Sequence, residues 1–360
     1  MKSGLADNTR WGMVSLKRLL RMKGGMAVFC SVLLLSGCAG NAGAPRVDVD
    51  ISPIISSQNI TAGNEGIVIG SVTMSSSEEW YKEVIAGMRA AAFDLGITLI
   101  EQDSNGDLTA EESQIRGFIN DHVDAIVICP ITSDRSGTVL SAAEDAGIPV
   151  VTWNNTVDAD VTAAVCVDPI ALGGNTGDYL AEYVRTNNLS GVQIGMITNE
   201  SYVIGVERCD GFKQALETLG NDGSAMVVCE ILAEAPDETD AAVRQMLSDY
   251  PGLDVIWCWN QTSLLACIDT VKNMGNTDLI IMGTDMSMDL ARDMQEGDVN
   301  LLAVTTQLPF HIGYKAVVNA VRAAKGEEVE KNILIPTFTY IKNDTDDLAQ
   351  YIDTHAQFVQ

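Results

Sequence analysis

Histidine is scarce in this sequence, with only 3 in 360 residues. His122, His311 and His355 are scattered, and no two of them stand at the spacing of metal ligands. We therefore expect no metal site and no cofactor. A serine–histidine–aspartate constellation needs a well-placed histidine. His311 follows a proline at position 309 and is predicted instead to lie in the first turn of a helix.

Catalytic motifs are also missing. The sequence has no GxSxG elbow, no glycine-rich phosphate loop of either standard spacing and no HExxH. Their absence favours a binding protein over an enzyme. An extracytoplasmic hydrolase is the enzyme alternative, because aspartate chemistry leaves weak traces in a sequence. Such an enzyme would turn over its ligand rather than hold it.

Basic side chains are few, with 22 Lys and Arg against 49 Asp and Glu and a formal charge of −27. The first 37 residues hold six of the basic side chains and one of the acidic ones, so the part from Cys38 onward has a formal charge of −32. Such a surface repels nucleic acid and anionic lipid headgroups. A transcription regulator is disfavoured, since it would need a basic helix-turn-helix at the N-terminus.

Paired cysteines at metal or redox spacing are absent, because none of the 8 cysteines forms a CxxC. Cys129, Cys166, Cys229 and Cys258 lie in apolar runs, where a small buried thiol is the usual state. We predict no disulfide, although an exported protein could oxidise a pair.

No hydrophobic run at the N-terminus is long enough to span a bilayer. The run at residues 26–35 has about ten residues, whereas a membrane-spanning helix needs about 20. Basic residues precede it and small residues follow, which is the order of a secretory signal. Leu35-Ser36-Gly37-Cys38 resembles the lipobox of bacterial lipoproteins. The resemblance implies cleavage before Cys38 and a lipid on its sulfur, which would anchor the chain outside the cell membrane.

The alternative is an ordinary signal peptide, residues 1–37, with an incidental cysteine after it. Met13 and Met22 are alternative starts, because the leader is long before its basic residues. Residues 38–65 are rich in Gly, Ala, Ser and Pro and predict a flexible tether.

From Gly66 onward, short apolar runs alternate with amphipathic stretches. Ten runs are β-branched and nearly continuous in hydrophobicity, which is typical of strands buried on both faces of a parallel sheet. Residues 75–96 predict a helix that opens on serines able to cap it and stops at Gly96. Repeated strand–helix units give doubly wound α/β layers. Ten strands exceed one ordinary sheet, so we predict an α/β fold of two lobes. The runs are IVIGSVT, ITLIE, DAIVIC, IPVVTW, TAAVCVD, GVQIGMI, SAMVVCEI, LDVIWCW, DLIIMGTD and NLLAVTTQ.

Seven segments follow one another along the chain: AIVICPITSD, IPVVTWNNTV, VDPIALGGNTGDYLAEYV, ERCDGFKQAL, IWCWNQTSLLACIDTVKNMG, IMGTDMSMD and VTTQLPFHIGYKAV. In this order they resemble the class I periplasmic binding proteins, in the ribose-binding branch. The resemblance implies two parallel-sheet lobes, joined by a three-crossing hinge, that close on a ligand between them. The expected N-terminal lobe is 66–167 plus 308–338, and the C-terminal lobe is 168–307 plus 339–360.

Ligands of open α/β sheets sit beyond the carboxyl ends of the strands. The resemblance carries specific roles onto residues at those ends. Trp80 and Tyr81 match aromatics that stack on a sugar ring. Asn154 and Asn155 stand where the family has an aspartate and an arginine, and Cys129 stands where the ribose binders carry an asparagine. The implied ligand contacts are Trp80, Tyr81, Asn154, Asn155, Arg208, Asn260, Asp285 and Gln307.

Structural roles are open for the same residues. Trp80 and Tyr81 could anchor a helix start in the core. Asn154 and Asn155 could be turn formers. Asp285 could cap the helix that follows it. Likewise, Arg208 could hold an ion pair between lobes, and residues 307–309 could be only a hinge.

The predicted function is a lipid-anchored extracytoplasmic substrate-binding protein of an ABC importer, with permease subunits as partners. Its ligand is expected to be neutral because the cleft keeps one opposite-charge pair, Arg208 and Asp285. A monosaccharide is expected first, and a sugar alcohol or nucleoside next. The alternative is a ligand sensor of the same fold that signals to a membrane receptor or kinase. The sequence does not separate transport from sensing.

Overall fold

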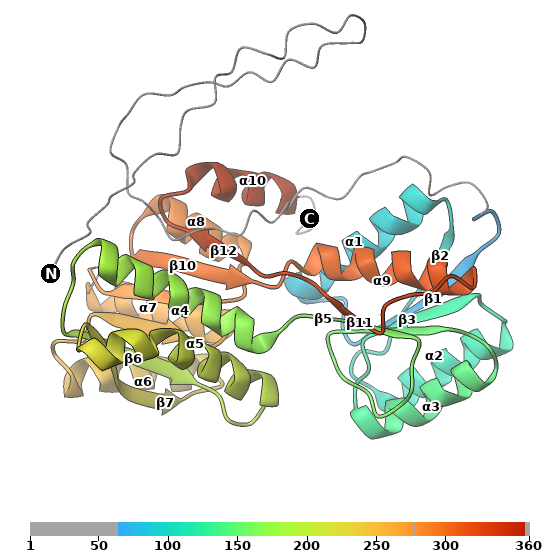
Figure 1. Ribbon diagram of the computed structural model, residues 1–360, viewed down its shortest axis with the longest axis horizontal. Helices are drawn as coiled ribbons and strands as arrows, with labels where there is room; N and C mark the ends of the chain where they lie inside the picture. The colour runs from blue at the N-terminus through green and yellow to red at the C-terminus, as the bar shows by residue number, and fades with distance from the viewer. Residues whose placement is uncertain (1–63, 277, 357–360) are drawn as a thin grey trace, which may run out of the picture. The chain divides into compact units, whose positions relative to one another are not determined.

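The computed structural model describes residues 64–276 and 278–356 (Figure 1). The predicted signal peptide, Cys38 and nearly all of the predicted tether lie outside this range. Two six-stranded sheets carry the described part, and helices pack on both faces of each. Strands and helices alternate along the chain, and each of the ten predicted strands is present. We call the two halves built on these sheets the first lobe and the second lobe.

The sheet of the first lobe is parallel throughout. Its strand order is β11-β5-β4-β3-β1-β2. The strands are β1 (Val68–Thr73), β2 (Thr98–Asp103), β3 (Ala125–Ile128), β4 (Val150–Trp153), β5 (Ala163–Cys166) and β11 (Asn332–Leu334).

Helices cover both faces of this sheet. On one face α1 and α9 pack together, and α2 and α3 lie on the other. The central strand β3 is buried on both sides, because Ile126 and Ile128 join the core under α2 and α3 while Ala125 and Val127 face the α1–α9 side. The helices are α1 (Glu79–Leu95), α2 (Leu108–Asn120), α3 (Ser133–Asp145) and α9 (Pro309–Ala324).

The second lobe repeats this design. Its strand order is β12-β10-β9-β8-β6-β7, so β7-β6-β8-β9-β10 matches β2-β1-β3-β4-β5. The edge strand β12 runs antiparallel to β10 and was not predicted from the sequence. The strands are β6 (Val192–Thr198), β7 (Ala225–Leu232), β8 (Val255–Cys258), β9 (Ile280–Thr284), β10 (Asn300–Thr306) and β12 (Phe338–Ile341).

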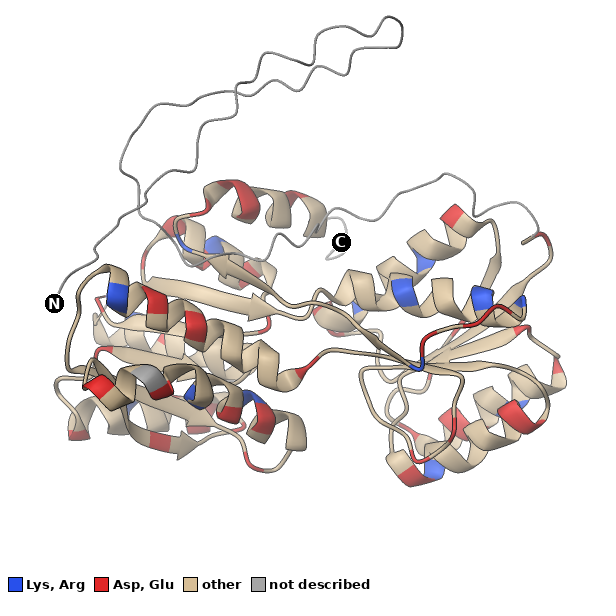
Figure 2. Cartoon of the chain, in the orientation of Figure 1, with Lys and Arg blue, Asp and Glu red and all other residues tan. Residues whose placement is uncertain are grey.

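The helices of the second lobe follow the same plan, with α4 and α5 packed together and α6 packed on α7. Two further helices, α8 and α10, contact each other near β10 and β12. The helices are α4 (Pro169–Thr186), α5 (Val203–Asp222), α6 (Pro236–Asp249), α7 (Gln261–Met274), α8 (Met288–Glu296) and α10 (Thr345–His355). Acidic positions outnumber basic ones on the helices of both lobes (Figure 2).

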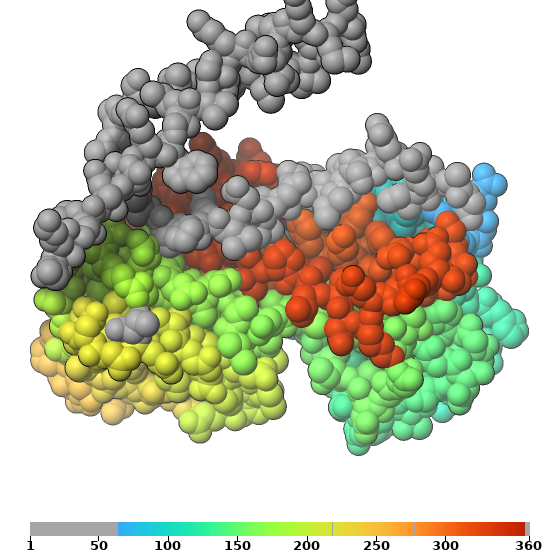
Figure 3. Space-filling view, in the orientation of Figure 1, coloured from blue at the N-terminus to red at the C-terminus, as the bar shows by residue number. Residues whose placement is uncertain are grey.

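The chain passes between the lobes three times. The passages lie between β5 and α4, between β10 and α9, and between β11 and β12. This confirms the predicted fold of two doubly wound lobes with a three-crossing hinge. As a result α9, late in the sequence, lies against the first lobe, where its orange surface meets the blue-to-green residues (Figure 3).

Glycines allow α1 and α9 to cross closely. A Cβ on Gly87 would lie 2.0 Å from the Phe310 carbonyl oxygen, and one on Gly313 would lie 1.9 Å from that of Val84. Any larger residue would therefore push the two backbones apart. These helices cannot cover the sheet together without glycine at both positions.

The ends of α1 agree with the sequence prediction only in part. Gly96 stops the helix in a left-handed conformation with φ of 66°, as expected. The serines before the helix do not cap it, because the N-cap residue is Glu78 and makes no side-chain cap hydrogen bond. Instead the hydroxyl groups of Ser75 and Ser77 form a hydrogen bond with each other, and the Ser76 hydroxyl donates a hydrogen bond to the Asp103 carboxylate.

Candidate functional site

The candidate site lies at the carboxyl ends of the parallel strands in both lobes. In each sheet the strand order reverses beside the first strand of the lobe, β1 or β6, and this switch point is where ligands of open α/β sheets bind. The repeated strand order makes each strand end in one lobe the counterpart of one in the other. The first lobe contributes Met74, Cys129, Asn154 and Val167, and their counterparts in the second lobe are Asn199, Trp259, Asp285 and Gln307.

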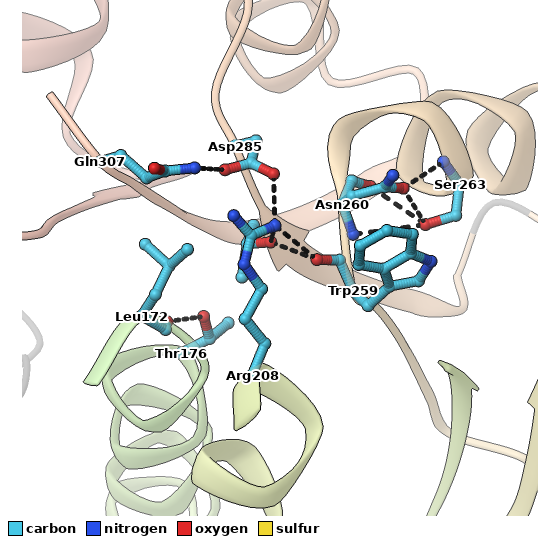
Figure 4. A network of polar contacts seen from close by, with 9 residues as sticks. Leu172, Thr176, Arg208, Trp259, Asn260, Ser263, Asp285 and Gln307 are labelled. Carbon is cyan, nitrogen blue, oxygen red and sulfur yellow. Dashed lines mark hydrogen bonds and ion pairs between the residues drawn. The ribbon is translucent and has the colours of Figure 1, made fainter. Parts of the chain in front are cut away.

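Asp285 is the centre of the polar group in the second lobe (Figure 4). Its Oδ2 accepts a 2.7 Å hydrogen bond from Arg208 Nη1, and its Oδ1 accepts one of 2.8 Å from Gln307 Nε2. The Arg208 and Asp285 side chains are 6% and 13% exposed. Three predicted contact residues from α5, β9 and β10 thus meet in one buried, charge-balanced cluster. Arg208 forms its ion pair within the second lobe.

The backbone at Asp285 forms a turn at the end of β9, and Asp285 is not the N-cap of the next helix. Its φ is 68°, and its N–H donates to the Thr305 carbonyl at 2.8 Å. The left-handed conformation is one that aspartate tolerates, and it turns the chain at the end of β9. The interpretation of Asp285 as a helix cap is wrong, because the Ser287 side chain caps α8.

Close packing of α5 on α4 holds Arg208 in place. A Cβ on Gly173 of α4 would lie 1.9 Å from the Arg208 carbonyl oxygen, and one on Gly211 would lie 2.0 Å from an α4 backbone oxygen. One residue later, Phe212 stacks on Trp257 at 4.6 Å between ring centroids. The spacing Arg208-x-x-Gly211-Phe212 in the segment ERCDGFKQAL therefore has a physical basis, because Gly211 and Phe212 pack the helix that carries the guanidinium.

Arg208 also organises the ends of β8 and β9. Its Nη1 donates to the Trp259 carbonyl at 3.1 Å and lies 3.4 Å from Thr284 Oγ1. Among the described residues, Arg208 Nε and Asn199 Nδ2 are buried donors with no hydrogen-bond partner. An oxygen of a bound solute would satisfy such donors, and the sequence did not single out Asn199 as a contact.

Asn260 has a structural role that was not predicted. Its Oδ1 caps α7, accepting from the Ser263 N–H at 2.9 Å and from the Ser263 hydroxyl at 2.8 Å. This leaves its amide N–H groups to contact a ligand. Beside it, Trp259 is buried and stacks with Tyr202 at 6.4 Å, and the Tyr202 ring is 55% exposed.

An aromatic cluster lies in the first lobe where α1 begins. Trp80 and Tyr81 meet edge to face at 5.1 Å, and both lie about 6 Å from the buried Trp153 ring. Both are partly buried against the core, so the anchoring role is real. Neither is fully buried, since both residues have intermediate exposure at the start of the helix.

The two asparagines of the first lobe are engaged with each other and with the loop. Asn154 has φ of 62°, and its Nδ2 donates to Asn155 Oδ1 at 3.0 Å. Asn155 Nδ2 donates to the Pro130 carbonyl at 3.0 Å and to Met74 Sδ at 3.4 Å. Both therefore form the turn after β4, and Asn154 retains more free hydrogen-bonding capacity than Asn155 does.

The Met74 sulfur accepts several side-chain hydrogen bonds in the first lobe. Besides Asn155, the Cys129 thiol and the Tyr81 hydroxyl donate to its sulfur at 3.6 and 3.7 Å. Burial raises the pKa of Cys129 to about 12 and raises that of Tyr81 as well, so both groups keep their protons at neutral pH. Met74 was not among the predicted contacts, because an apolar residue after a strand gives no signal in the sequence.

A contact between α1 and α8 brings the two sets of residues near each other. Glu79, the residue before Trp80, accepts a 3.0 Å hydrogen bond from the Met288 N–H, three residues after Asp285. The aromatic cluster and the Asp285 cluster therefore lie at the same side of the lobe interface.

Within residues 64–276 and 278–356, no group of three or more His, Cys, Asp or Glu side chains is placed to hold a metal ion. The six cysteines in this range are free thiols. None of its helices is both long and apolar enough to cross a membrane.

Residues 69–328 match the model of the periplasmic binding protein domain. The chain belongs to this family. It is a class I periplasmic binding protein of the ribose-binding-like branch, a solute-binding protein and not an enzyme. This confirms the resemblance that the seven sequence segments indicated.

Relatives and solved structures support the assignment. The chain is 27% identical to the ABC transporter periplasmic-binding protein YphF of Escherichia coli K12, over 82% of this chain and 91% of YphF. It is 25% identical to the ribose import binding protein RbsB of the same organism, over 68% and 80%. A Bacillus halodurans ABC transporter solute-binding protein with bound myo-inositol is 26% identical, with a TM-score of 0.65 over 81% and 99%.

Proposed function

We propose that this periplasmic binding protein holds a neutral, polyhydroxylated small molecule between its lobes, most directly a monosaccharide. The observation that carries the proposal is the buried Arg208–Asp285–Gln307 cluster at the carboxyl ends of β9 and β10. A carboxylate can accept from two sugar hydroxyls, and an amide can both donate and accept.

Charge balance supports a neutral ligand. Asp285 and Arg208 already neutralise each other at 2.7 Å, so a phosphate or dicarboxylate would meet a carboxylate without an additional matched cation. Aromatic faces at Trp80 and Tyr81 suit the C–H face of a sugar ring. Ligands named for the relatives, ribose and myo-inositol, belong to the same chemical class.

The remaining parts of the proposal concern location and partners. Cys38 would carry the lipid that anchors the chain outside the cell membrane, and permease subunits of an ABC importer would receive the solute from it. The lobes, 66–167 plus 308–338 and 168–307 plus 339–360, would close around the ligand by a hinge motion. The family assignment and the N-terminal sequence support these parts.

A thermal-shift screen tests the ligand class. Monosaccharides, sugar alcohols and nucleosides are compared with sugar phosphates and dicarboxylates at equal concentration. Because binding to the native state raises stability with ligand excess, at least one neutral polyol should raise the Tm by several degrees at 100 times its Kd. Stabilisation by anionic ligands alone would contradict the proposal. Calorimetry on the best compound then gives the affinity.

A further inference from the structure

The side chains at equivalent strand ends differ in polarity between the two lobes. At the four matched strand ends, the first lobe carries Met74, Cys129, Asn154 and Val167, where the second carries Asn199, Trp259, Asp285 and Gln307. The match is close in detail for one pair. Asn154 and Asp285 both have left-handed φ angles, of 62° and 68°, and both donate their N–H to the next strand of the sheet. The same backbone position thus carries an amide in one lobe and a carboxylate in the other.

Most side-chain hydrogen-bond donors near the strand ends of the first lobe donate to acceptors within that lobe. The hydroxyl of Tyr81, the thiol of Cys129 and one N–H of Asn155 all point at Met74 Sδ, at 3.7, 3.6 and 3.4 Å. The other N–H of Asn155 goes to the Pro130 carbonyl. A thioether is a weak hydrogen-bond acceptor, yet the Met74 sulfur accepts from three donors that would otherwise be available to hydroxyl groups of a ligand. What remains around Met74 is sulfur and aromatic surface, and Asn154 at a neighbouring strand end is the polar side chain with hydrogen-bonding capacity left.

The second lobe shows the opposite situation. Asp285 and Gln307 form a polar cluster there, and the buried donors Arg208 Nε and Asn199 Nδ2 have no partner in the described part of the chain. A ligand held between such walls is pulled by its hydroxyls toward the second lobe. Its least hydroxylated end then lies against Met74, because a hydroxyl placed on this sulfur meets an acceptor that already has three donors and cannot replace the hydrogen bonds that water gave.

We propose that the ligand is a deoxy sugar or a comparable polyol, with a methyl or methylene group against Met74 of the first lobe and its hydroxyl groups toward Asp285 of the second. The inference rests on the proposed function, since it specifies the solute class of the same site. It makes Met74 a specificity-determining residue.

Calorimetry on the purified full chain tests this with pairs that differ only by CH₃ against CH₂OH. Suitable pairs are L-fucose and L-galactose, and L-rhamnose and L-mannose, which all keep the pyranose ring. We expect the deoxy member of the best-binding pair to bind about 10- to 100-fold more tightly, since apolar pockets reject an added hydroxyl by up to about 100-fold. Equal or tighter binding of the hydroxylated member in every binding pair would overturn the inference and leave the proposed function standing. Binding of no neutral polyol at all would overturn both.

The variant Met74→Gln gives a second test. It puts an amide of similar length where the thioether lies, so the preference for the deoxy member should fall at least fivefold. Met226→Gln is the matched control, because Met226 is 52% exposed near the amino end of β7, whereas the candidate site lies at the carboxyl ends of the strands. The control should keep the wild-type preference. An unchanged preference in a folded Met74→Gln protein would overturn the role of Met74.

Discussion

At the scale of single residues, the Arg208–Asp285 ion pair matters both for the stability of the fold and for the proposed binding of the ligand. The two side chains are nearly inaccessible to water and meet at 2.7 Å. Removing one member of such a pair leaves the other charge buried without compensation, which is costly. The same carboxylate is the strongest acceptor in the proposed binding site, so we expect its loss to weaken both folding and binding.

We therefore expect Asp285→Ala to lower the free energy of unfolding by about 3 kcal/mol or more, because it leaves the Arg208 guanidinium buried and unpaired. Solute affinity should fall by about 2 kcal/mol or more, since ligand hydroxyls lose their acceptor. Urea unfolding and calorimetry measure the two effects. Asp289→Ala is the control, because Asp289 is 71% exposed beside Arg292 and should change both quantities little. Wild-type affinity in the Asp285 variant would remove it from the site.

Sequence reasoning identified single residues unevenly. Asp285, Arg208 and Gln307 stand out as polar groups at strand ends or in a motif, and the structure brings them together. The cap formed by Asn260 was missed, although a serine three residues later is a capping spacing. Met74 could not be found, because two of the three donors to its sulfur lie 55 and 81 residues away in the sequence.

At the scale of elements, glycine contacts determine how closely α5 packs on α4. They therefore also determine the position of the Arg208 side chain. A Cβ on Gly173 would be 1.9 Å from the Arg208 carbonyl oxygen, whereas one on the adjacent Gly174 has its nearest neighbour at 3.6 Å. Two neighbouring glycines in one helix thus face very different surroundings.

Gly173→Ala should therefore lower the free energy of unfolding by about 1–3 kcal/mol, the usual cost of forcing packed elements apart. It should also weaken solute binding, because α5 carries Arg208. Gly174→Ala is the matched control and should be neutral or stabilising by about 0.5–1 kcal/mol, since alanine favours a helix more than glycine does. Equal stability of the two variants would contradict this account of the helix contact.

Elements were predicted well where hydrophobic runs were long. Ten apolar runs correspond to β1–β10, and the predicted helix stop at Gly96 has a positive φ. The two missed strands are short, with three residues in β11 and four in β12. They add to sheet edges and alternate in burial, so no continuous apolar run marks them.

At the scale of the whole molecule, one ion pair connects the lobes at α1 and α10. His355 Nε2 lies 2.8 Å from Glu83 Oε1, and both side chains are largely buried. Glu79 on α1 and Tyr351 and Tyr340 on the second-lobe side also face this pair. Burial alone lowers the pKa of His355, but the hydrogen bond to Glu83 and its negative charge raise it above the ordinary 6.5.

Because the folded pKa of His355 is raised, protonation of this histidine stabilises the native state. The contribution is complete below about pH 6.5 and is lost as the pH rises through the folded pKa. The Tm difference between wild type and His355→Asn should therefore be larger at about pH 6 than at about pH 9. The control is His122→Asn, at an exposed position with φ of 54° that asparagine tolerates. A Tm difference independent of pH would show that the ion pair adds no stability.

Attachment to the membrane is a prediction for the intact precursor. Cys38→Ala should abolish lipid addition, so the protein should lack the mass of the lipid and leave the membrane fraction. Mass spectrometry and fractionation measure this, with Cys30→Ala as the control because that cysteine lies in the apolar run of the leader. Retention of the Cys38 variant in the membrane at unchanged mass would disprove the lipobox interpretation.

The three crossings of the chain also constrain the order of folding. The first lobe needs α9 to cover one face of β3, β4 and β5 and needs β11 at its edge, yet both follow almost the entire second lobe. The second lobe in turn lacks its edge strand until residue 341. Domains usually complete folding in the order in which they leave the ribosome, N-terminal first. Here both sheets stay incomplete until nearly the whole chain has emerged, so we expect the polypeptide to remain incompletely folded until synthesis is almost over.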